Sequence, residues 1–418
     1  MTERSMFYVN INKKINLPIY TMRLPGSRAY IVNATEFIPL LQRQWRTISF
    51  TPILASSGPA VMGISEASGE ILHRDMKSDS NSVAGFIPAI LPSLAPGPSL
   101  DSMNRKAVEV MAAAMDVLRT QKTKTMKFWE WTHHEILMAT TDAVYGPQNP
   151  YRNVAVEAAR SNTFGPSYMK FALSPFKSIL APKAYRAREL LASAWLNYLQ
   201  SGGHESASEF AKSTHSHNAG HGFSVENMAR TEIGHSFATV GTTALTSWWL
   251  MYHIFSDPVV LADIRKELSG LVVEDEKRGA HCIDMSSIRT ACPIFLSTFK
   301  ETMRYRGVGT SVRLCLEDHM PDGRYLLKKG SLVITPQLVQ HTLPSVWGDD
   351  AETFNHLRFV PSPGRKRPNL QFDLVPTGGK WIQPRDGREW RVSFSGSNEG
   401  MEITSEDMDM KAGVSKTK

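Results

Sequence analysis

The sequence predicts one domain that is mainly α-helical and carries small β-sheets. Helical periodicity dominates from Leu100 to about Leu199, and the uncharged stretch Ile233–Phe255 is long enough to cross a bilayer. That stretch contains two histidines, two glycines and several hydroxyl residues, so a buried central helix explains it better than a membrane span. Short alternating segments outside the helical region are typical of strands. The chain has no internal repeat, and its 418 residues can bury a large core.

The first expected elements are a strand hairpin and a helix. Leu17–Asn33 contains two short strand-like runs around a Pro-Gly-Ser turn. A helix then begins near Ala34, with Asn33 or Thr35 placed to cap it. Farther along, the segment Pro88–Ser99 is rich in proline, serine and glycine, and this composition predicts a loop.

The second half of the chain predicts helices followed by strands. A polar linker of glycine, serine and histidine at Ser201–Phe223 precedes them. The polar tail Ser395–Lys418 has no apolar period, so we expect it to be disordered. Between the linker and the tail we expect a long helix at Glu226–Phe255, helices at Val259–Val272 and Cys292–Tyr305, and strands at Ser311–Glu317 and Leu326–Ile334.

Four histidines lie in or beside the polar linker, at positions 204, 215, 217 and 221. The spacing of His215, His217 and His221 could hold a zinc or nickel ion. A flexible loop without a nearby cysteine or aspartate more often carries solvated histidines. We therefore expect no metal site at His204 or at the other three.

Charge and cysteine content limit the classes of partner. The net charge is +7 and the pI is about 9.2, but the basic residues are scattered and not interleaved with aromatic residues. This pattern does not favour a nucleic-acid partner. The three cysteines, Cys282, Cys292 and Cys315, form neither a disulfide framework nor a Cys-x-x-Cys metal motif. They suit a reducing compartment.

One motif pairs a glutamate with two arginines. Glu301 and Arg304 lie one helical turn apart on the same helix face. The later segment Phe-Asn-His-Leu-Arg-Phe supplies Arg358 as a second cation for Glu301. A Glu-x-x-Arg pair alone is common on surface helices, but here strand-like segments follow the helix and Arg358 lies in an aromatic context.

This Glu–Arg–Arg set resembles the structural triad of the cytochromes P450, and the resemblance covers roughly residues 17–381. Further similar segments are Ala139-Thr-Thr-Asp-Ala-Val-Tyr-Gly-Pro-Gln-Asn-Pro and Leu338-Val-Gln-His-Thr. They look like the branch with sterol hydroxylases, prostacyclin synthase-like enzymes and fungal secondary-metabolism members. The resemblance implies a haem-dependent monooxygenase. It would hydroxylate a lipophilic substrate (a sterol, terpenoid or polyketide) with dioxygen and electrons from a flavoprotein reductase.

The resemblance also implies roles for four residues near a haem. Thr242 and Thr243 match the alcohol positions on the distal helix, although no carboxylate precedes them as in the common pattern. An alternative is that both hydroxyls donate to the carbonyl one turn back. Arg313 and His341 match positions that meet the haem propionates, or are ordinary polar groups at strand ends. An isomerase or dehydratase that needs no electrons is a variant within this class.

The haem-ligand cysteine of the family has no counterpart in the chain. The last cysteine is Cys315, and after Asn369 the sequence runs directly into Leu370-Gln-Phe-Asp-Leu-Val-Pro-Thr-Gly-Gly-Lys-Trp, which resembles a segment beyond the cysteine loop. We therefore expect haem from the family but no thiolate ligand. The alternative function is a catalytically inactive pseudoenzyme or truncated gene product. The expected parts are a cytochrome P450-like domain at 1–369, a strand remnant at 370–394 and a tail at 395–418.

The N-terminal segment carries no apolar run for a signal peptide or membrane anchor. Full-length relatives are implied to reside at the endoplasmic reticulum membrane. We expect the chain as printed to be cytoplasmic or peripherally bound, with a membrane surface as a further candidate partner.

Overall fold

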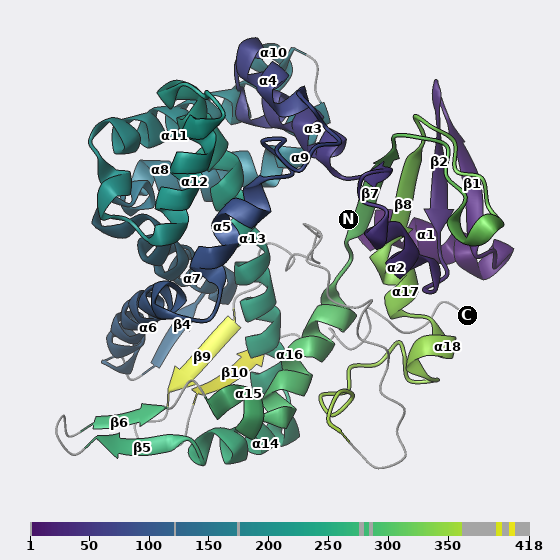
Figure 1. Cartoon of the computed structure of the whole chain (residues 1–418). Coiled ribbons are helices and arrows are strands. Elements are labelled where there is room, and N and C mark those ends of the chain that lie inside the picture. The colour runs from purple at the N-terminus through teal and green to yellow at the C-terminus, as the bar shows by residue number, and fades with distance from the viewer. Residues whose placement is uncertain are drawn as a thin grey trace.

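The computed structural model of the chain describes residues 2–120, 123–173, 176–275, 280–283, 287–361, 390–394 and 401–405. Figure 1 shows a large helical part beside a smaller part built on a sheet, with helix α13 (Val225–Phe255) between them. Among these residues, none of the helices has both the length and the apolar character that crossing a membrane requires.

The larger sheet has five strands in the order β1-β2-β8-β7-β3. Strand β2 runs parallel to β8, and the other neighbours are antiparallel. The predicted hairpin is confirmed, and its two-residue turn needs Gly26, whose φ of 70° is costly for other residues. Helix α2 (Phe37–Arg43) packs Phe37 and Leu41 against this sheet. The strands are β1 Ile19–Leu24, β2 Ser27–Val32, β3 Ile48–Ser49, β7 Thr310–Cys315 and β8 Leu332–Pro336.

Helix α13 is the centre of the helical part. The Ser224 hydroxyl caps it by accepting from the Asn227 amide, and the helix packs against α7 and α11 on one side and α16 on the other. Its side chains Ile233, Val240 and Ala244 are fully buried in the main core. The prediction of a buried central helix is confirmed. The helices around it are α7 Phe128–Tyr145, α11 Pro182–Gln200, α14 Pro258–Ser269 and α16 Pro293–Arg306.

The remaining elements surround these two parts. The helices are α1 Thr2–Ile15, α3 Thr51–Met62, α4 Glu66–His73, α5 Phe86–Leu94, α6 Pro98–Arg119, α8 Val154–Ala158, α9 Gly165–Leu173, α10 Lys177–Leu180, α12 Glu209–Gly220, α15 Ile288–Ala291, α17 Gln337–His341 and α18 Pro344–Trp347. Single turns are η1 Gly146–Gln148, η2 Pro150–Arg152, η3 Ala159–Phe164, η4 Gly203–Ser206 and η6 Pro321–Gly323. Two small sheets contain β4 Thr123–Met126 with β9 Trp390–Phe394 and β10 Met401–Ser405, and β5 Val272–Asp275 with β6 Ala280–Ile283.

The loop prediction for Pro88–Ser99 was wrong. Most of that segment belongs to α5, and α6 begins at Pro98. Proline is tolerated in the first turn of a helix, where the backbone amide has no intrahelical partner. Burial of Ile90 and Ser93 against neighbouring helices favours the helix despite the composition.

The linker prediction for Ser201–Phe223 was also wrong. Helix α12 occupies the middle of this segment, and its N-cap Ser208 accepts from the Ala211 amide. Phe210, Ala211 and Asn218 are buried, so packing stabilises a helix that its polar composition does not predict.

One strand boundary and part of the tail also differ from expectation. The strand expected from Leu326 begins only at Leu332, because Gly330 adopts a φ of 77° that interrupts the extended backbone. Strand β10 lies inside the segment expected to be disordered. The rest of that tail, and residues 362–389, lie outside the described residues, so the expected division at 369 and 394 stays a prediction.

Candidate functional site

The three residues of the predicted triad meet in a buried ion-pair cluster. Glu301, Arg304 and Arg358 expose 0%, 1% and 3% of their surface. Arg304 donates from Nε and Nη2 to the two Glu301 oxygens, at 2.7 Å each. The Nε of Arg358 donates to the same oxygens at 3.0 and 3.1 Å. The Asn355 amide adds a bond of 2.9 Å, so the Glu301 carboxylate has donors on both oxygens.

The guanidinium groups of this cluster also hold the backbone that follows α17. Arg304 Nη1 donates to the carbonyls of His341 and Ala351, at 2.7 Å each. Arg358 donates to the Trp347 carbonyl at 3.1 Å and to the Asp350 carboxylate at 2.8 Å. These bonds join helix α16 to residues 341–358, which carry no long helix or strand of their own. The cluster therefore fixes a segment that has few backbone bonds to hold it.

Thr242 and Thr243 lie next to each other on α13 but in different surroundings. Thr243 is exposed, and its hydroxyl donates to the Thr239 carbonyl at 2.8 Å, as the alternative interpretation expects. Thr242 is half-buried, and its carbonyl accepts from the Thr246 hydroxyl at 2.8 Å. A methyl group placed on Gly241 would meet no atom within 4 Å. The Gly241 side of this turn therefore faces open space.

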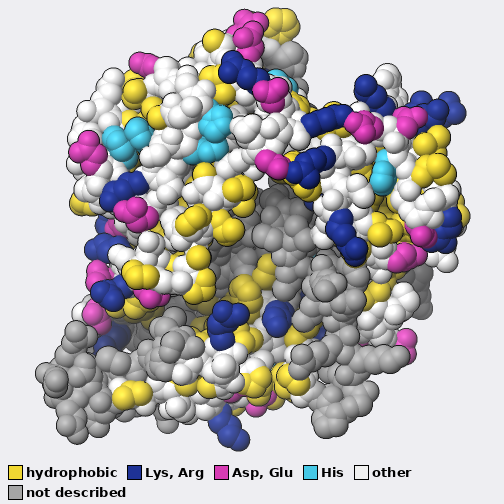
Figure 2. Space-filling model, in the orientation of Figure 1, with side chains coloured by type: hydrophobic (Ala, Val, Ile, Leu, Met, Phe, Trp, Pro, Cys, Tyr) yellow, Lys and Arg dark blue, Asp and Glu magenta, His cyan; other side chains and the backbone are white. Residues whose placement is uncertain are grey.

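The molecular surface is hollowed on the face drawn in Figure 2, between the helical part and the sheet. Arg313 and His341 come from the sheet side of the molecule, on β7 and α17. Arg313 donates to the Ile48 carbonyl at 3.5 Å, and burial lowers the pKa of its guanidinium. The ring of His341 is buried beside Trp347, with the two ring centroids 6.3 Å apart. The structure thus places Arg313 and His341 on elements separate from the α13 threonines.

Cys292 and Cys315, the two cysteines whose side chains the structure describes, do not fit the role of a haem ligand. A haem thiolate must be deprotonated and must reach the iron. Cys315 is buried in the core of the sheet, where its thiol donates to the Glu317 carbonyl at 2.8 Å and burial raises its pKa. Cys292 is fully buried before α16, and burial, followed by the charge of Glu267, raises its pKa. The surroundings of both side chains therefore favour the neutral thiol. The sequence has no cysteine after Cys315.

Sequence reasoning missed a small polar pocket at the other end of α13. Its key contact joins the buried carboxylate of Glu232 to the Tyr145 hydroxyl, which donates to it at 3.0 Å. Burial and the nearby Glu232 charge raise the pKa of Tyr145 well above its ordinary value. The available signal was Glu232 itself, an acidic residue directly before the uncharged stretch Ile233–Phe255. The pocket is lined by Tyr145, Tyr198, Leu199, His204, Ala211, His215, Asn218, Met228 and Glu232.

The linker histidines are not the solvated side chains that the sequence predicts. His204 and His215 stack with their ring centroids 4.0 Å apart at the polar pocket, and His217 and His221 contact backbone carbonyls of another segment. Within the described ranges, no group of three histidine, cysteine, aspartate or glutamate side chains is arranged to hold a metal ion.

Comparison with known proteins adds to this geometry. The family model described as Cytochrome P450 matches residues 186–374. The chain is 27% identical over 422 residues to the cytochrome P450 monooxygenase nodJ of Hypoxylon pulicicidum, covering 91% of this chain and 80% of that protein. These matches support membership of the cytochrome P450 superfamily. A cytochrome P450 monooxygenase of Gibberella zeae is 24% identical, over 86% of this chain and 68% of the relative.

Solved cytochrome P450 structures share the fold. A zebra fish cytochrome P450 structure with abiraterone matches with a TM-score of 0.67 at 14% identity, covering 89% of this chain and 86% of that one. A retinoic acid-bound cyanobacterial cytochrome P450 matches with a TM-score of 0.62 at 18% identity, over 85% of this chain and 77% of the other. The predicted fold class, mainly helical with small sheets and cytochrome P450-like, is confirmed.

Proposed function

We propose that the chain descends from a cytochrome P450 monooxygenase that hydroxylates a lipophilic substrate, and that the chain as printed does not carry out that reaction itself. The monooxygenase names of the Hypoxylon pulicicidum and Gibberella zeae relatives support the first part. Support for the second comes from Cys292 and Cys315, whose surroundings favour neutral thiols. The position of these two thiols is the observation that carries the proposal.

The remaining site residues keep supporting roles in this proposal. The buried Glu301 cluster holds residues 341–358 against α16, and the open turn at Gly241 and Thr242 leaves room beside α13 for an apolar molecule. Arg313 and His341 would meet the haem propionates in a complete family member. Haem, when bound by such a member, supplies the activation of dioxygen. No step through haem follows for this chain, because its described cysteines do not fit the iron.

The partner and location that we propose apply to the lineage. A flavoprotein reductase would supply electrons, and a relative from Fusarium oxysporum is itself named a bifunctional cytochrome P450/NADPH–P450 reductase. The net charge of +7 favours an acidic partner surface. The lipophilic substrate class is a sterol, terpenoid or polyketide, and the endoplasmic reticulum membrane is the proposed location of full-length lineage members.

Haem stoichiometry tests this function. The full chain is expressed with a haem precursor, purified, and analysed for haem per polypeptide as the pyridine haemochrome. We expect far less than one haem per chain, since the thiolate that would hold the iron is missing. Close to one tightly bound haem per chain would refute the inactive assignment. The handling control is Glu352→Gln, which removes only an exposed ion pair with Lys13.

A further inference from the structure

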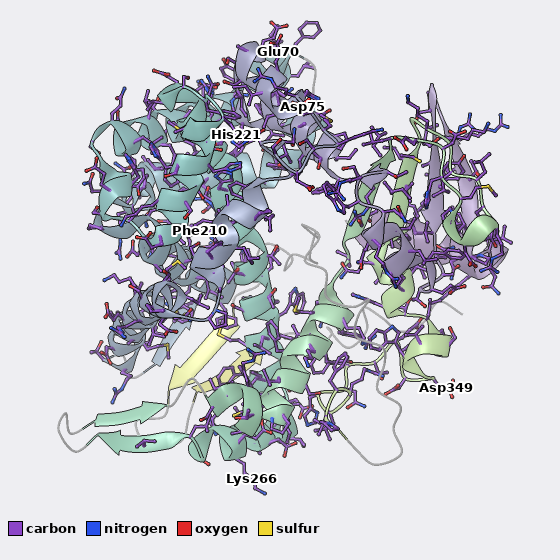
Figure 3. The ribbon with its side chains drawn as sticks, in the orientation of Figure 1. Glu70, Asp75, Phe210, His221, Lys266 and Asp349 are labelled. Atoms are coloured by element: carbon purple, nitrogen blue, oxygen red, sulfur yellow. The ribbon has the colours of Figure 1, made fainter. Side chains whose placement is uncertain are left out.

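The connection between α4 and α5 is held by two histidines of α12. The Nε2 atom of His217 lies 2.8 Å from the carbonyl oxygen of Ser82. The Nε2 atom of His221 lies 3.1 Å from the carbonyl oxygen of Ser80. Figure 3 labels His221 at the end of α12 and Asp75 on the connection. We call His217 and His221 the histidine clamp.

The ring of His221 has a carbonyl oxygen at each nitrogen. Besides the Ser80 contact at Nε2, its Nδ1 lies 2.8 Å from the carbonyl oxygen of His217. A carbonyl can only accept a hydrogen bond, so each contact requires a hydrogen on the ring nitrogen. Neutral imidazole carries one such hydrogen and imidazolium carries two. Only the protonated ring satisfies both contacts, and the neutral ring would turn a lone pair toward one oxygen.

His221 lies at the end of α12. His221 is the C-cap residue of this helix, where unsatisfied carbonyls give a partial negative charge. A cationic side chain at this position is stabilised by that charge and by bonding to the last carbonyls. His217 needs only one hydrogen, because the Ser82 carbonyl is its acceptor. Burial lowers the pKa of His217; the Ser82 carbonyl opposes this effect, and the nearby His221 and His235 add to it.

The clamped segment leads directly into α5. Ser82 and Asn81 are buried, and the Asn81 side chain accepts from the amides of Val83 and Ala84 at 2.9 and 3.1 Å. Phe86, the first residue of α5, stacks on His235 of α13 with ring centroids 4.7 Å apart, and its ring edge meets His217. The clamp therefore fixes the start of α5 to α12 and α13.

Other charged groups act on the clamp from the elements around it. Two exposed ion pairs, Arg46 with Asp79 and Lys77 with Glu317, tie the connection to the sheet part. The elements around the clamp carry further titratable groups. They include Asp75 on the connection, Glu66, Glu70 and His73 on α4, Glu209, Lys212 and His215 on α12, and His235 with its partner Glu232 on α13.

We propose that His217 and His221 form a pH-dependent clamp, in which protonated His221 holds the α4–α5 connection on α12 and loss of its proton loosens that connection. The sign follows from the two contacts. The bond that needs the second ring hydrogen exists while the ring carries both hydrogens and is lost when the ring gives one up, which a rise in pH favours. Loss of one hydrogen bond from a charged donor should raise the equilibrium constant for local opening roughly tenfold. The clamp needs no haem and does not depend on the proposed function.

Hydrogen–deuterium exchange of the full chain tests the proposal. Exchange of the Val83 and Ala84 amides is followed from about pH 5.5 to about pH 8 and corrected for intrinsic exchange, with α13 amides as the internal reference. We expect the opening equilibrium to rise about tenfold across this range in the wild type. His221→Gln keeps a donor but cannot be protonated, so its corrected exchange should be independent of pH.

The control is His73→Gln, because His73 is an exposed histidine on α4 at the start of the same connection. It should keep the wild-type pH dependence. Exchange in the wild type that does not change with pH would overturn the proposal, and this result needs no variant to fold. A pH dependence that persists in His221→Gln, or that disappears in His73→Gln, would also overturn it.

Discussion

Glu301→Gln removes the only carboxylate that contacts both Arg304 and Arg358 among the described residues, and leaves two guanidinium groups buried. In the native protein the Glu301 oxygens accept from Arg304 at 2.7 Å, from Arg358 at 3.0 and 3.1 Å, and from the Asn355 amide. Glutamine keeps one acceptor oxygen, but its side-chain NH2 group would face the N–H donors of the two arginines. Removing one partner of a buried ion pair typically costs about 3–5 kcal/mol.

The measurement is equilibrium urea unfolding followed by tryptophan fluorescence. A fall of about 3–5 kcal/mol is a large part of the roughly 5–15 kcal/mol that stabilises a typical protein, so the unfolding midpoint should move clearly. The matched control is Glu352→Gln, which breaks the exposed ion pair to Lys13, whose two side chains are 57% and 62% exposed. This control should lower the free energy of unfolding by less than about 1 kcal/mol. Equal, small effects of both substitutions would refute the structural role of the Glu301 cluster.

Three further predictions follow from single positions. Gly241→Ala should raise the free energy of unfolding by up to about 1 kcal/mol, because the added methyl group lies in a helix and meets open space. Gly234→Ala should not raise it, because its methyl group would lie 2.5 Å from the Met62 sulfur. Thermal melts of both variants check this prediction. Burial and Arg160 lower the pKa of His133 to about 4, so acidification from about pH 6.5 toward 4 favours the unfolded chain. His133→Gln should therefore lose less of its free energy of unfolding in urea between about pH 7 and 4.5 than the wild type does. An unchanged loss would contradict this prediction. Cys292 and Cys315 should resist iodoacetamide in the native protein and react after unfolding, as mass spectrometry of the labelled peptides can show; rapid native labelling of either would contradict their burial.

The sequence predicted those elements whose local residue pattern favours the same structure that their packing stabilises. The Pro25-Gly26 turn lies between alternating residues, and the hairpin follows because Gly26 can adopt the required positive φ. The spacing of Glu301 and Arg304 placed both side chains on one helix face, and the segment around Arg358 supplied the second cation. The bonds from Arg304 and Arg358 to the backbone carbonyls of His341, Trp347 and Ala351 were not predicted, because they depend on how residues 341–358 pack on α16.

Elements stabilised mainly by tertiary contacts could not be predicted in this way. Helix α12 has a polar composition, and what holds it is the Ser208 cap and the burial of Phe210 and Asn218 among other helices. The contacts of His217 and His221 depend on a connection more than 130 residues earlier in the chain. The local sequence therefore predicted solvated histidines, and only the fold brings their rings to the Ser80 and Ser82 carbonyls.

The most direct test of the central claim is the carbon monoxide difference spectrum of the reduced full chain, prepared with added haem. We predict no red-shifted thiolate-type Soret band, because the described thiols are buried and held neutral by their surroundings. Cys282→Ser, Cys292→Ser and Cys315→Ser, measured in parallel, identify any cysteine sulfur that does bind. A thiolate-type band in the wild type that disappears in one of these variants would contradict the account.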